Sequence, residues 1–160
     1  MESIENSCCF TGHRIIRTEH RDKLNENLCL IIEDLYNTGV YRFLCGGALG
    51  FDTVAAKAVI SMKSKFPAIK LILALPCHEQ EKSWSKSSII EYEAIKSSAD
   101  EVIYISDKYY DGCMQKRNRF MVDNSTHCVF YLTSVRGGTG YTVKYALEKE
   151  RKMHNIITLV

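Results

Sequence analysis

The sequence predicts an α/β protein, a Rossmann-like three-layer sandwich around one mostly parallel sheet of about six strands. Short apolar runs alternate with longer amphipathic runs along the chain, and several of the short runs end in glycine-rich turns. Strands that alternate with helices form a parallel sheet through right-handed crossovers. Because the chain has 160 residues and no visible linker or repeat, residues 1–160 are expected to form a single domain.

The first half of the chain supplies three expected strands. The strand at 8–11 is followed by a helix at about 19–38, in which Leu24, Leu28 and Leu35 recur at helical spacing. A strand at 40–45 leads into a helix at about 51–65, which ends before Pro67. The run 69–75 is apolar throughout, as expected of a central parallel strand covered on both faces by helices.

The second half repeats this alternation. A polar loop that carries Trp84 precedes a helix at 88–98 and a strand at 101–105. The polar loop 106–112 holds Tyr109 and Tyr110, and it is followed by a helix at 114–124 and a strand at 127–132. A helix at 141–153 and a last strand at 156–160 complete the pattern, the latter on the apolar residues Ile156, Ile157, Leu159 and Val160.

Composition narrows the function classes. Twenty-one Lys and Arg residues against 19 Asp and Glu give a net charge of +2, too balanced to indicate nucleic-acid binding from bulk charge. The seven cysteines are an odd number without a signal peptide or a CxxC pair, so we expect free thiols buried as small hydrophobes and no metal. No apolar run reaches the ~20 residues of a membrane span. A cytoplasmic protein is expected.

Three expected strands run into glycine-containing turns. Segments 11–14, 46–50 and 136–140 follow the first, second and fifth strands. In open parallel sheets, ligands bind in the crevice beyond the carboxyl ends of the strands, where all three turns are expected to meet. Glycine lets the backbone approach a ligand closely, and the helices that follow offer free N–H groups to an anion. The segment 137–140 fits a phosphate cradle, to which Arg136 adds charge.

Each polar group near these turns has two interpretations. Asp52 either complements the dipole of its helix or bonds a ribose hydroxyl or a base amine. His13 and Arg14 either point into the crevice or lie on the solvated surface. The cationic run 116–119 either meets phosphates or nucleic acid, or is a solvated helix face. No Gly-Lys-Ser/Thr follows a glycine turn, which disfavours an NTP-hydrolysing P-loop.

Four segments resemble the YpsA/YoqJ-type proteins of the SLOG superfamily. They read CCFTGHR, GGALGFD, RNRFMVDNS and GGTGYT, at residues 8–14, 46–52, 117–125 and 137–142. The resemblance covers essentially the whole chain and implies a Rossmann-like fold with a nucleotide or nucleotide-derived ligand. Related proteins include DprA, which binds single-stranded DNA, and LOG-type phosphoribohydrolases, which release bases from nucleoside monophosphates.

One departure from the LOG pattern bears on catalysis. LOG-type enzymes carry a glutamate after their second glycine turn, whereas this chain has Lys144 there, between Val143 and Tyr145. Glycosidic cleavage needs a carboxylate to stabilise an oxocarbenium-like state or to activate water, and a lysine does neither. The sequence therefore favours binding over hydrolysis, and we assign no catalytic residue.

The principal hypothesis is a protein that binds or senses a nucleotide-type ligand, with no other cofactor. An N-glycosidase of the LOG type is the first alternative. A DprA-like module for single-stranded DNA is the second, suggested by 116–119 and by Trp84, Tyr109 and Tyr110. Rossmann-like relatives often self-associate, so a homo-oligomer stays open. The expected ligand-binding residues are Thr11, Gly12, His13, Arg14, Gly46, Gly47, Gly50, Asp52, Arg117, Asn118, Gly137, Gly138, Thr139 and Gly140.

Overall fold

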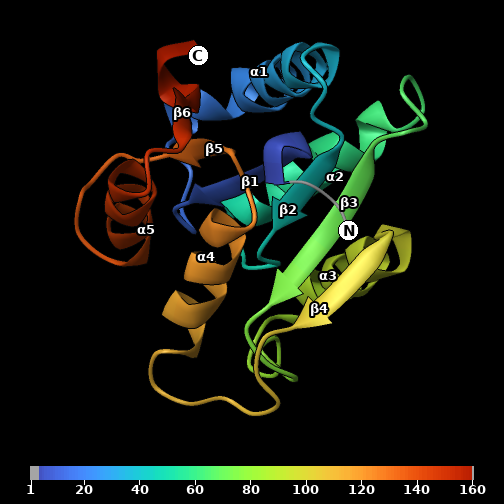
Figure 1. Ribbon diagram of the computed structural model, residues 1–160. Helices are drawn as coiled ribbons and strands as arrows, with labels where there is room; N and C mark the ends of the chain where they lie inside the picture. The colour runs from blue at the N-terminus through green and yellow to red at the C-terminus, as the bar shows by residue number, and fades with distance from the viewer. Residues whose placement is uncertain (1–3, 160) are drawn as a thin grey trace.

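An all-parallel sheet of six strands organises the computed structural model, which describes residues 4–159 (Figure 1). The strand order is β4-β3-β2-β1-β5-β6. The strands are β1 (Ser7–Gly12), β2 (Arg42–Cys45), β3 (Lys70–Leu75), β4 (Glu101–Tyr104), β5 (His127–Tyr131) and β6 (Lys152–Asn155). The helices are α1 (Thr18–Asn37), α2 (Phe51–Met62), α3 (Lys86–Ser98), α4 (Cys113–Asp123) and α5 (Gly138–Glu148), with short 3-10 helices η1 (Ile4–Asn6) and η2 (Ile156–Leu159). The predicted Rossmann-like α/β class is confirmed.

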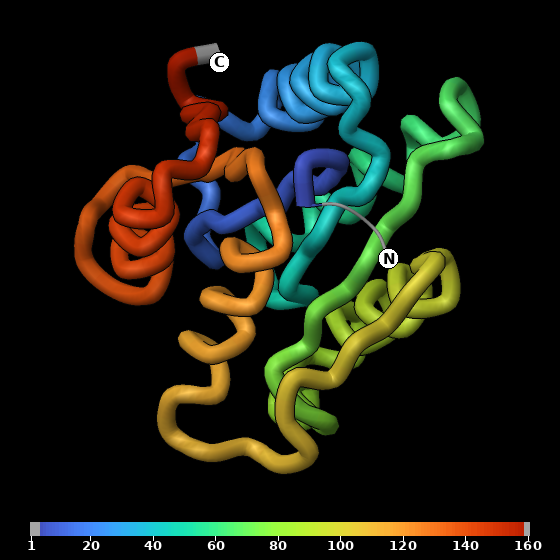
Figure 2. Tube along the Cα trace, in the orientation of Figure 1, coloured from blue at the N-terminus to red at the C-terminus, as the bar shows by residue number. Residues whose placement is uncertain are grey.

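Helices cover both faces of the sheet. Successive strand residues point to opposite faces, so the apolar strands present apolar side chains to both layers of helices. Phe10, Phe43 and Leu71 pack into one core with apolar residues of α1, α2 and α3. Their neighbours Cys9, Leu44 and Ile72 pack on the other face with residues of α4 and α5. The trace in Figure 2 follows this three-layer arrangement along the chain. Both faces of the central strands are therefore apolar, as the continuous apolar run in β3 predicts.

The order of the strands reverses between β1 and β5. The chain proceeds outward from β1 to β4, and α4 then returns it to β5 on the other side of β1. The two strands end level with each other, since Thr11 pairs with Phe130 and Gly12 with Tyr131. In open α/β sheets such a switch point leaves a crevice beyond the strand ends, because the connecting helices diverge to opposite faces.

The seven cysteines are free thiols, and all but the half-buried Cys29 are buried. This confirms their prediction as small core residues. Over residues 4–159, no helix combines the length and the apolar character needed to cross a membrane.

The C-terminal segment departs from the sequence prediction. Helix α5 ends at Glu148 rather than near Met153, and Glu150 follows in a left-handed conformation with φ of 59°. The last strand is the polar segment Lys152–Asn155, which pairs with β5 at the edge of the sheet. The expected strand at 156–160 is wrong: residues 156–159 form η2, and Val160 lies outside the described residues.

The apolar side chains of η2 explain this error. Ile156 is fully buried in the core that includes α1, so its hydrophobicity reflects packing on a helix rather than sheet pairing. Asn155 turns the chain, because its side-chain oxygen accepts a hydrogen bond from the N–H of Ile157 at 3.0 Å. Apolar periodicity over four or five residues does not separate these two situations.

Two histidines stack where β5 pairs with β6. The rings of His127 and His154 lie 5.2 Å apart at an interplanar angle of 21°, and His127 Nδ1 lies 2.9 Å from His154 Nε2. Burial, followed by the charges of the nearby His154 and Lys152, lowers the pKa of His127 to about 4. Burial and Lys152 also lower the pKa of His154. When both rings are neutral, a single proton between His127 Nδ1 and His154 Nε2 makes the hydrogen bond that joins them.

This pair predicts a pH dependence of stability. Between pH 6.5 and about pH 4 the unfolded chain binds a proton at His127 that the folded protein does not, so acidification through this window lowers stability. The His127→Phe variant lacks that titration and should lose less stability than the wild type between pH 7 and pH 4.5. Urea unfolding at several pH values measures the difference, and parallel curves for the two proteins would contradict the assignment.

Candidate functional site

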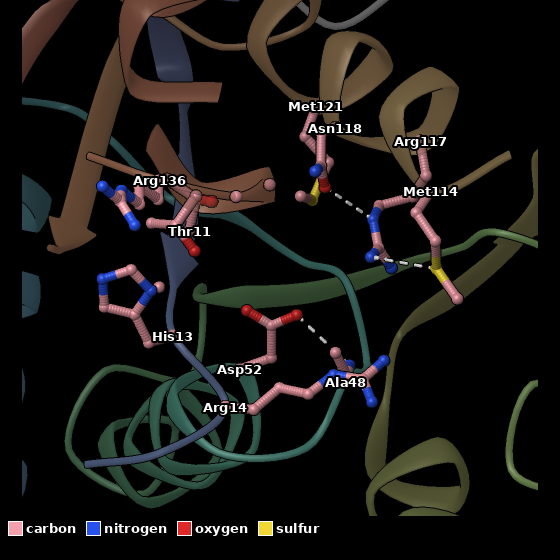
Figure 3. Close-up of a pocket in the computed structure, with 14 residues that line it drawn as sticks. Thr11, His13, Arg14, Ala48, Asp52, Met114, Arg117, Asn118, Met121 and Arg136 are labelled. Atoms are coloured by element: carbon pink, nitrogen blue, oxygen red, sulfur yellow. Dashed lines mark hydrogen bonds between the residues drawn. The ribbon is translucent and has the colours of Figure 1, made fainter. Parts of the chain in front are cut away.

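A pocket of about 310 Å³ lies at the switch point between β1 and β5, and we call it the switch-point pocket (Figure 3). The turn after β1, the turn before α2, the helix α4 and the first residues of α5 form its walls. Its lining consists of Thr11, Gly12, His13, Arg14, Ala48, Asp52, Met114, Arg117, Asn118, Met121, Arg136, Gly137, Gly138 and Thr139.

The pocket brings together most of the residues that the sequence assigned to a ligand. Ten of them line it, from segments that are more than a hundred residues apart in sequence. Four glycines of the predicted set do not line it: Gly46, Gly47, Gly50 and Gly140.

Close packing accounts for two of these glycines. Gly50 has φ of 81°, and a Cβ there would collide with the backbone carbonyl of Arg14. A Cβ on Gly140 would collide in the same way with the carbonyl of Val135. These glycines hold the turns against their neighbours, and they shape the pocket from behind.

The guanidinium of Arg117 is buried beneath the pocket, with only 4% of the residue exposed. Its Nη1 donates to the carbonyl oxygen of Gly46, just after β2, and to that of Ala74 in β3 at 3.5 Å. Its Nε donates to Asn118 Oδ1 at 2.8 Å. Arg117 thus ties α4 to the ends of two strands, and it holds the amide of Asn118 at the pocket wall.

Asp52 lies across Gly46 from this guanidinium. A Cβ on Gly46 would lie 2.9 Å from Asp52 Oδ2 and 2.7 Å from Arg117 Nη1, so only glycine leaves room for both groups. The same Oδ2 accepts a hydrogen bond from the N–H of Ala48 at 3.2 Å. Asp52 therefore braces its own turn as well as lining the pocket.

Burial dominates the electrostatics of this pair. It raises the pKa of Asp52, and the charges of Arg117 and Arg14 and the Ala48 N–H act in the opposite direction. Burial also lowers the pKa of Arg117, which the carboxylate of Asp52 opposes. Each group thus offsets part of the desolvation of the other, and removal of either makes the burial of the remaining group more costly.

His13 connects the two strands at the switch point. Its Nε2 accepts hydrogen bonds from the N–H groups of Thr133 at 3.0 Å and Ser134 at 3.3 Å, in the loop after β5. Burial and the charge of Arg17 lower the pKa of His13, which favours the neutral ring that this acceptor role requires. His13 lines the pocket as expected, and it also fixes the position of the wall opposite α4.

The remaining cations, Arg14 and Arg136, and the start of α5 also line the pocket. Arg14 and Arg136 are exposed, and within residues 4–159 neither guanidinium donates a hydrogen bond or forms an ion pair. The first N–H groups of α5 have no acceptor within the helix. A Cβ on Gly138 would have no atom within 4 Å, so the backbone here is open to the pocket.

Sequence reasoning missed three lining residues. Ala48, Met114 and Met121 were not assigned to the site, and Arg136 entered only as a source of charge. Residues 114, 117, 118 and 121 follow the i, i+3, i+4, i+7 spacing of one helix face, a signal that could have placed both methionines beside Arg117 and Asn118.

Other residues that the sequence singled out lie elsewhere. Lys144 is exposed on α5 and does not line the pocket. Trp84 packs edge-on against Tyr92 with ring centroids 5.2 Å apart, and so covers the core. Tyr109 and Tyr110 are exposed in the loop before α4.

Comparison with known proteins finds a family match and similar sequences. Residues 11–160 match the YpsA family, described as the YspA SLOG family. The uncharacterized SPbeta prophage-derived protein YoqJ of Bacillus subtilis is 37% identical over 137 residues, which are 78% of this chain and 80% of YoqJ.

Two solved structures of DNA processing protein A (DprA) share the fold. That from Streptococcus pneumoniae has a TM-score of 0.65 at 14% identity, and covers 93% of this chain and 49% of its own. The Helicobacter pylori structure, described as showing a single-stranded DNA binding mode, has a TM-score of 0.65 at 16% identity and covers 94% and 64%. This chain thus spans about half to two thirds of these DprA chains.

The Asp52–Arg117 arrangement predicts a coupled effect on stability. Arg117→Met should lower the free energy of unfolding by about 2–4 kcal/mol, because it removes the donor to the buried carbonyls of Gly46 and Ala74 and a cation near the buried Asp52. Adding Asp52→Asn should restore part of the loss, since the amide oxygen still accepts from Ala48 without a charge. Urea unfolding of the single and double variants gives the coupling energy.

Arg119→Met, a similar change on the same helix, is the control. Arg119 is partly exposed and donates to the hydroxyl of Tyr141 at 3.1 Å, so its loss should cost less than about 1 kcal/mol. Equal losses for the two arginine variants, or a further loss on adding Asp52→Asn, would contradict the coupling.

Proposed function

The chain belongs to the YpsA family of SLOG proteins, and from this membership and the pocket we propose that it binds a nucleotide or nucleotide-derived ligand at the switch point. The observation that carries the proposal is the open start of α5 next to Arg136, in a pocket that Arg14 also lines. Backbone N–H groups at a helix N-terminus and guanidinium groups are both suited to phosphate oxygens.

The charge of the lining supports an anionic ligand. Arg14, Arg117 and Arg136 contribute three cations, whereas Asp52 is the one carboxylate among the described lining residues. Asp52 and Arg117 largely offset each other at the floor. The remaining positive charge therefore lies at Arg14, which extends toward Ala48 in Figure 3, and at Arg136, which lies on the other side of Asp52. We place the phosphate at Arg136 and the start of α5.

The opposite wall suits the remainder of a nucleotide. Met114 and Met121 of α4 present polarizable thioethers, which pack well against a flat ring. Asn118 lies between them along the helix, and because its Oδ1 accepts from Arg117, its amide nitrogen is left to donate to a ligand. In this arrangement Asp52 and Asn118 select hydroxyl or amine groups of the sugar or base.

The lining favours binding over glycosidic cleavage. The carboxylate of Asp52 is engaged by the Ala48 N–H and lies beside Arg117, so it is poorly placed to activate water or to donate a proton. Lys144 stands outside the pocket. If the protein were an N-glycosidase, incubation with nucleoside monophosphates would release free base, which chromatography detects.

Single-stranded DNA is a second candidate ligand. One DprA relative in fold is described as binding it, and in this chain Tyr109 and Tyr110 are exposed on the loop before α4, near the exposed Lys108 and Lys116. Base stacking on tyrosine and phosphate contacts to lysine give binding that weakens steeply as salt rises. Fluorescence anisotropy of a labelled poly-dT oligonucleotide with the wild type and Tyr110→Ala separates this mode from mononucleotide binding.

The proposal predicts that a side chain at Gly138 blocks the pocket. A Cβ there meets no atom, so Gly138→Leu should fold normally while it fills the space for the phosphate. In a thermal-shift assay, AMP at about a hundred times its dissociation constant should stabilise the wild type by about 2.7 kcal/mol, and should not stabilise the variant.

Ser87→Leu is the matched control, since Ser87 is exposed in the first turn of α3 and does not line the switch-point pocket. It should respond to AMP as the wild type does. A wild type that no nucleotide stabilises, or an equal response of Gly138→Leu, would overturn the proposal.

A further inference from the structure

A second hollow of about 440 Å³ adjoins the switch-point pocket, and we call it the outer hollow. The two share His13, Arg14 and Arg136, so they form one continuous depression. The outer hollow adds Ile15 and Arg17 from the turn before α1, and Thr133 and Ser134 from the loop after β5. The proposed nucleotide site therefore extends past its first phosphate position.

Hydrogen bonds fix the backbone around the outer hollow. The N–H of Arg17 donates to the hydroxyl of the fully buried Tyr131 at 3.0 Å, and that hydroxyl lies 2.7 Å from His20 Nδ1. The ring of His13 holds the N–H groups of Thr133 and Ser134. The Ser134 hydroxyl accepts from the N–H of Arg136 at 3.3 Å. The three arginines thus project from anchored chain segments rather than from free loops.

The outer hollow concentrates positive charge. Arg14, Arg17 and Arg136 all line it, and its described lining includes no carboxylate. Within residues 4–159, none of the three guanidiniums donates a hydrogen bond or forms an ion pair. The charge of Arg14 also acts on the carboxylate of Asp52 in the switch-point pocket. Arg17 and Arg136 share the outer hollow without a carboxylate in its described lining, and an anion held there would be attracted by both.

We propose that the ligand of this protein carries a chain of phosphates, whose distal group occupies the outer hollow and contacts Arg17. The inference rests on the proposed function, since it extends the same site. It specifies the ligand class as a nucleoside diphosphate or triphosphate: one phosphate lies at the start of α5, and the next lies between Arg136 and Arg17. A nucleoside monophosphate fills only the switch-point pocket.

Isothermal titration calorimetry with AMP, ADP and ATP tests this, in buffer with EDTA so that no divalent cation neutralises the phosphates. In the wild type, ATP should bind at least about tenfold more tightly than AMP. The distal phosphates make a charge-assisted contact with Arg17 in addition to the contact of the first phosphate at the start of α5. Arg17→Gln should remove most of that advantage and leave AMP affinity within about twofold. Lys23→Gln, an equal change of charge at an exposed position on α1 outside both pockets, should bind ATP as the wild type does.

The outcomes separate the two claims. If AMP and ATP bind equally tightly and Arg17→Gln changes neither, the proposed function stands and the inference is wrong. If Arg17→Gln weakens AMP and ATP by the same factor, Arg17 acts on the pocket as a whole and the inference is again wrong. If no nucleotide binds to the wild type, the proposed function fails and the inference fails with it. An ATP advantage that is lost in Arg17→Gln and kept in Lys23→Gln supports both.

Discussion

The buried guanidinium of Arg117 organises the edge of the sheet at which the pocket lies. It reaches from α4 to carbonyl oxygens at the ends of β2 and β3, and Asp52 approaches it from the start of α2. Three segments distant in sequence are held in place by one charged group, and Gly46 is small enough to let them meet. Because burial is costly for both charges and each offsets part of that cost for the other, Asp52 and Arg117 couple the GGALGFD turn to the RN pair of α4. The floor of the pocket follows from this arrangement.

The other half of the pocket follows from the reversal of strand order between β1 and β5. Since α1 and α5 leave these strands toward opposite faces, the turns at their ends flank a crevice. His13 accepts two hydrogen bonds from the loop after β5, so it links the two sides of the crevice. The groups that line this half are electropositive: the first N–H groups of α5 carry partial positive charge, and Arg14, Arg17 and Arg136 carry full charges. Asp52 and Arg117, whose charges largely offset each other, lie at the floor of the pocket. The exposed arginines lie at its rim, where a phosphate-bearing ligand would supply negative charge.

Much of this architecture could be predicted from the sequence. The strands β1, β2, β3 and β5 are covered on both faces by helices or loops, and such strands appear in a sequence as short, continuous apolar runs. The prediction of the C-terminal strand was wrong because β6 is not covered on both faces. The edge strand β6 is polar and half-exposed, and the apolar Ile156 belongs to a helical turn packed on α1. At the site, the glycine turns correctly predicted the edge of the sheet at which the pocket lies. The pattern did not separate glycines that line the pocket from Gly50 and Gly140, where a Cβ would collide with a backbone carbonyl. Nor did it indicate that Arg117 would be buried, since a run of four polar and charged residues is usually a solvated helix face. That distinction depends on tertiary contacts with Gly46 and Ala74, which lie far away in the chain.

The central claim is that a phosphate-bearing ligand binds at the start of α5, opposite α4. Amide chemical shifts of the isotopically labelled protein during a titration with ADP test it most directly, because they report the position of the ligand residue by residue. The account predicts saturable shifts that are largest at Gly137, Gly138 and Thr139, accompanied by shifts at Arg14 and Asn118, and negligible shifts on α3 around Ser87. No saturable shift, or shifts confined to surfaces away from the ends of β1 and β5, would contradict it.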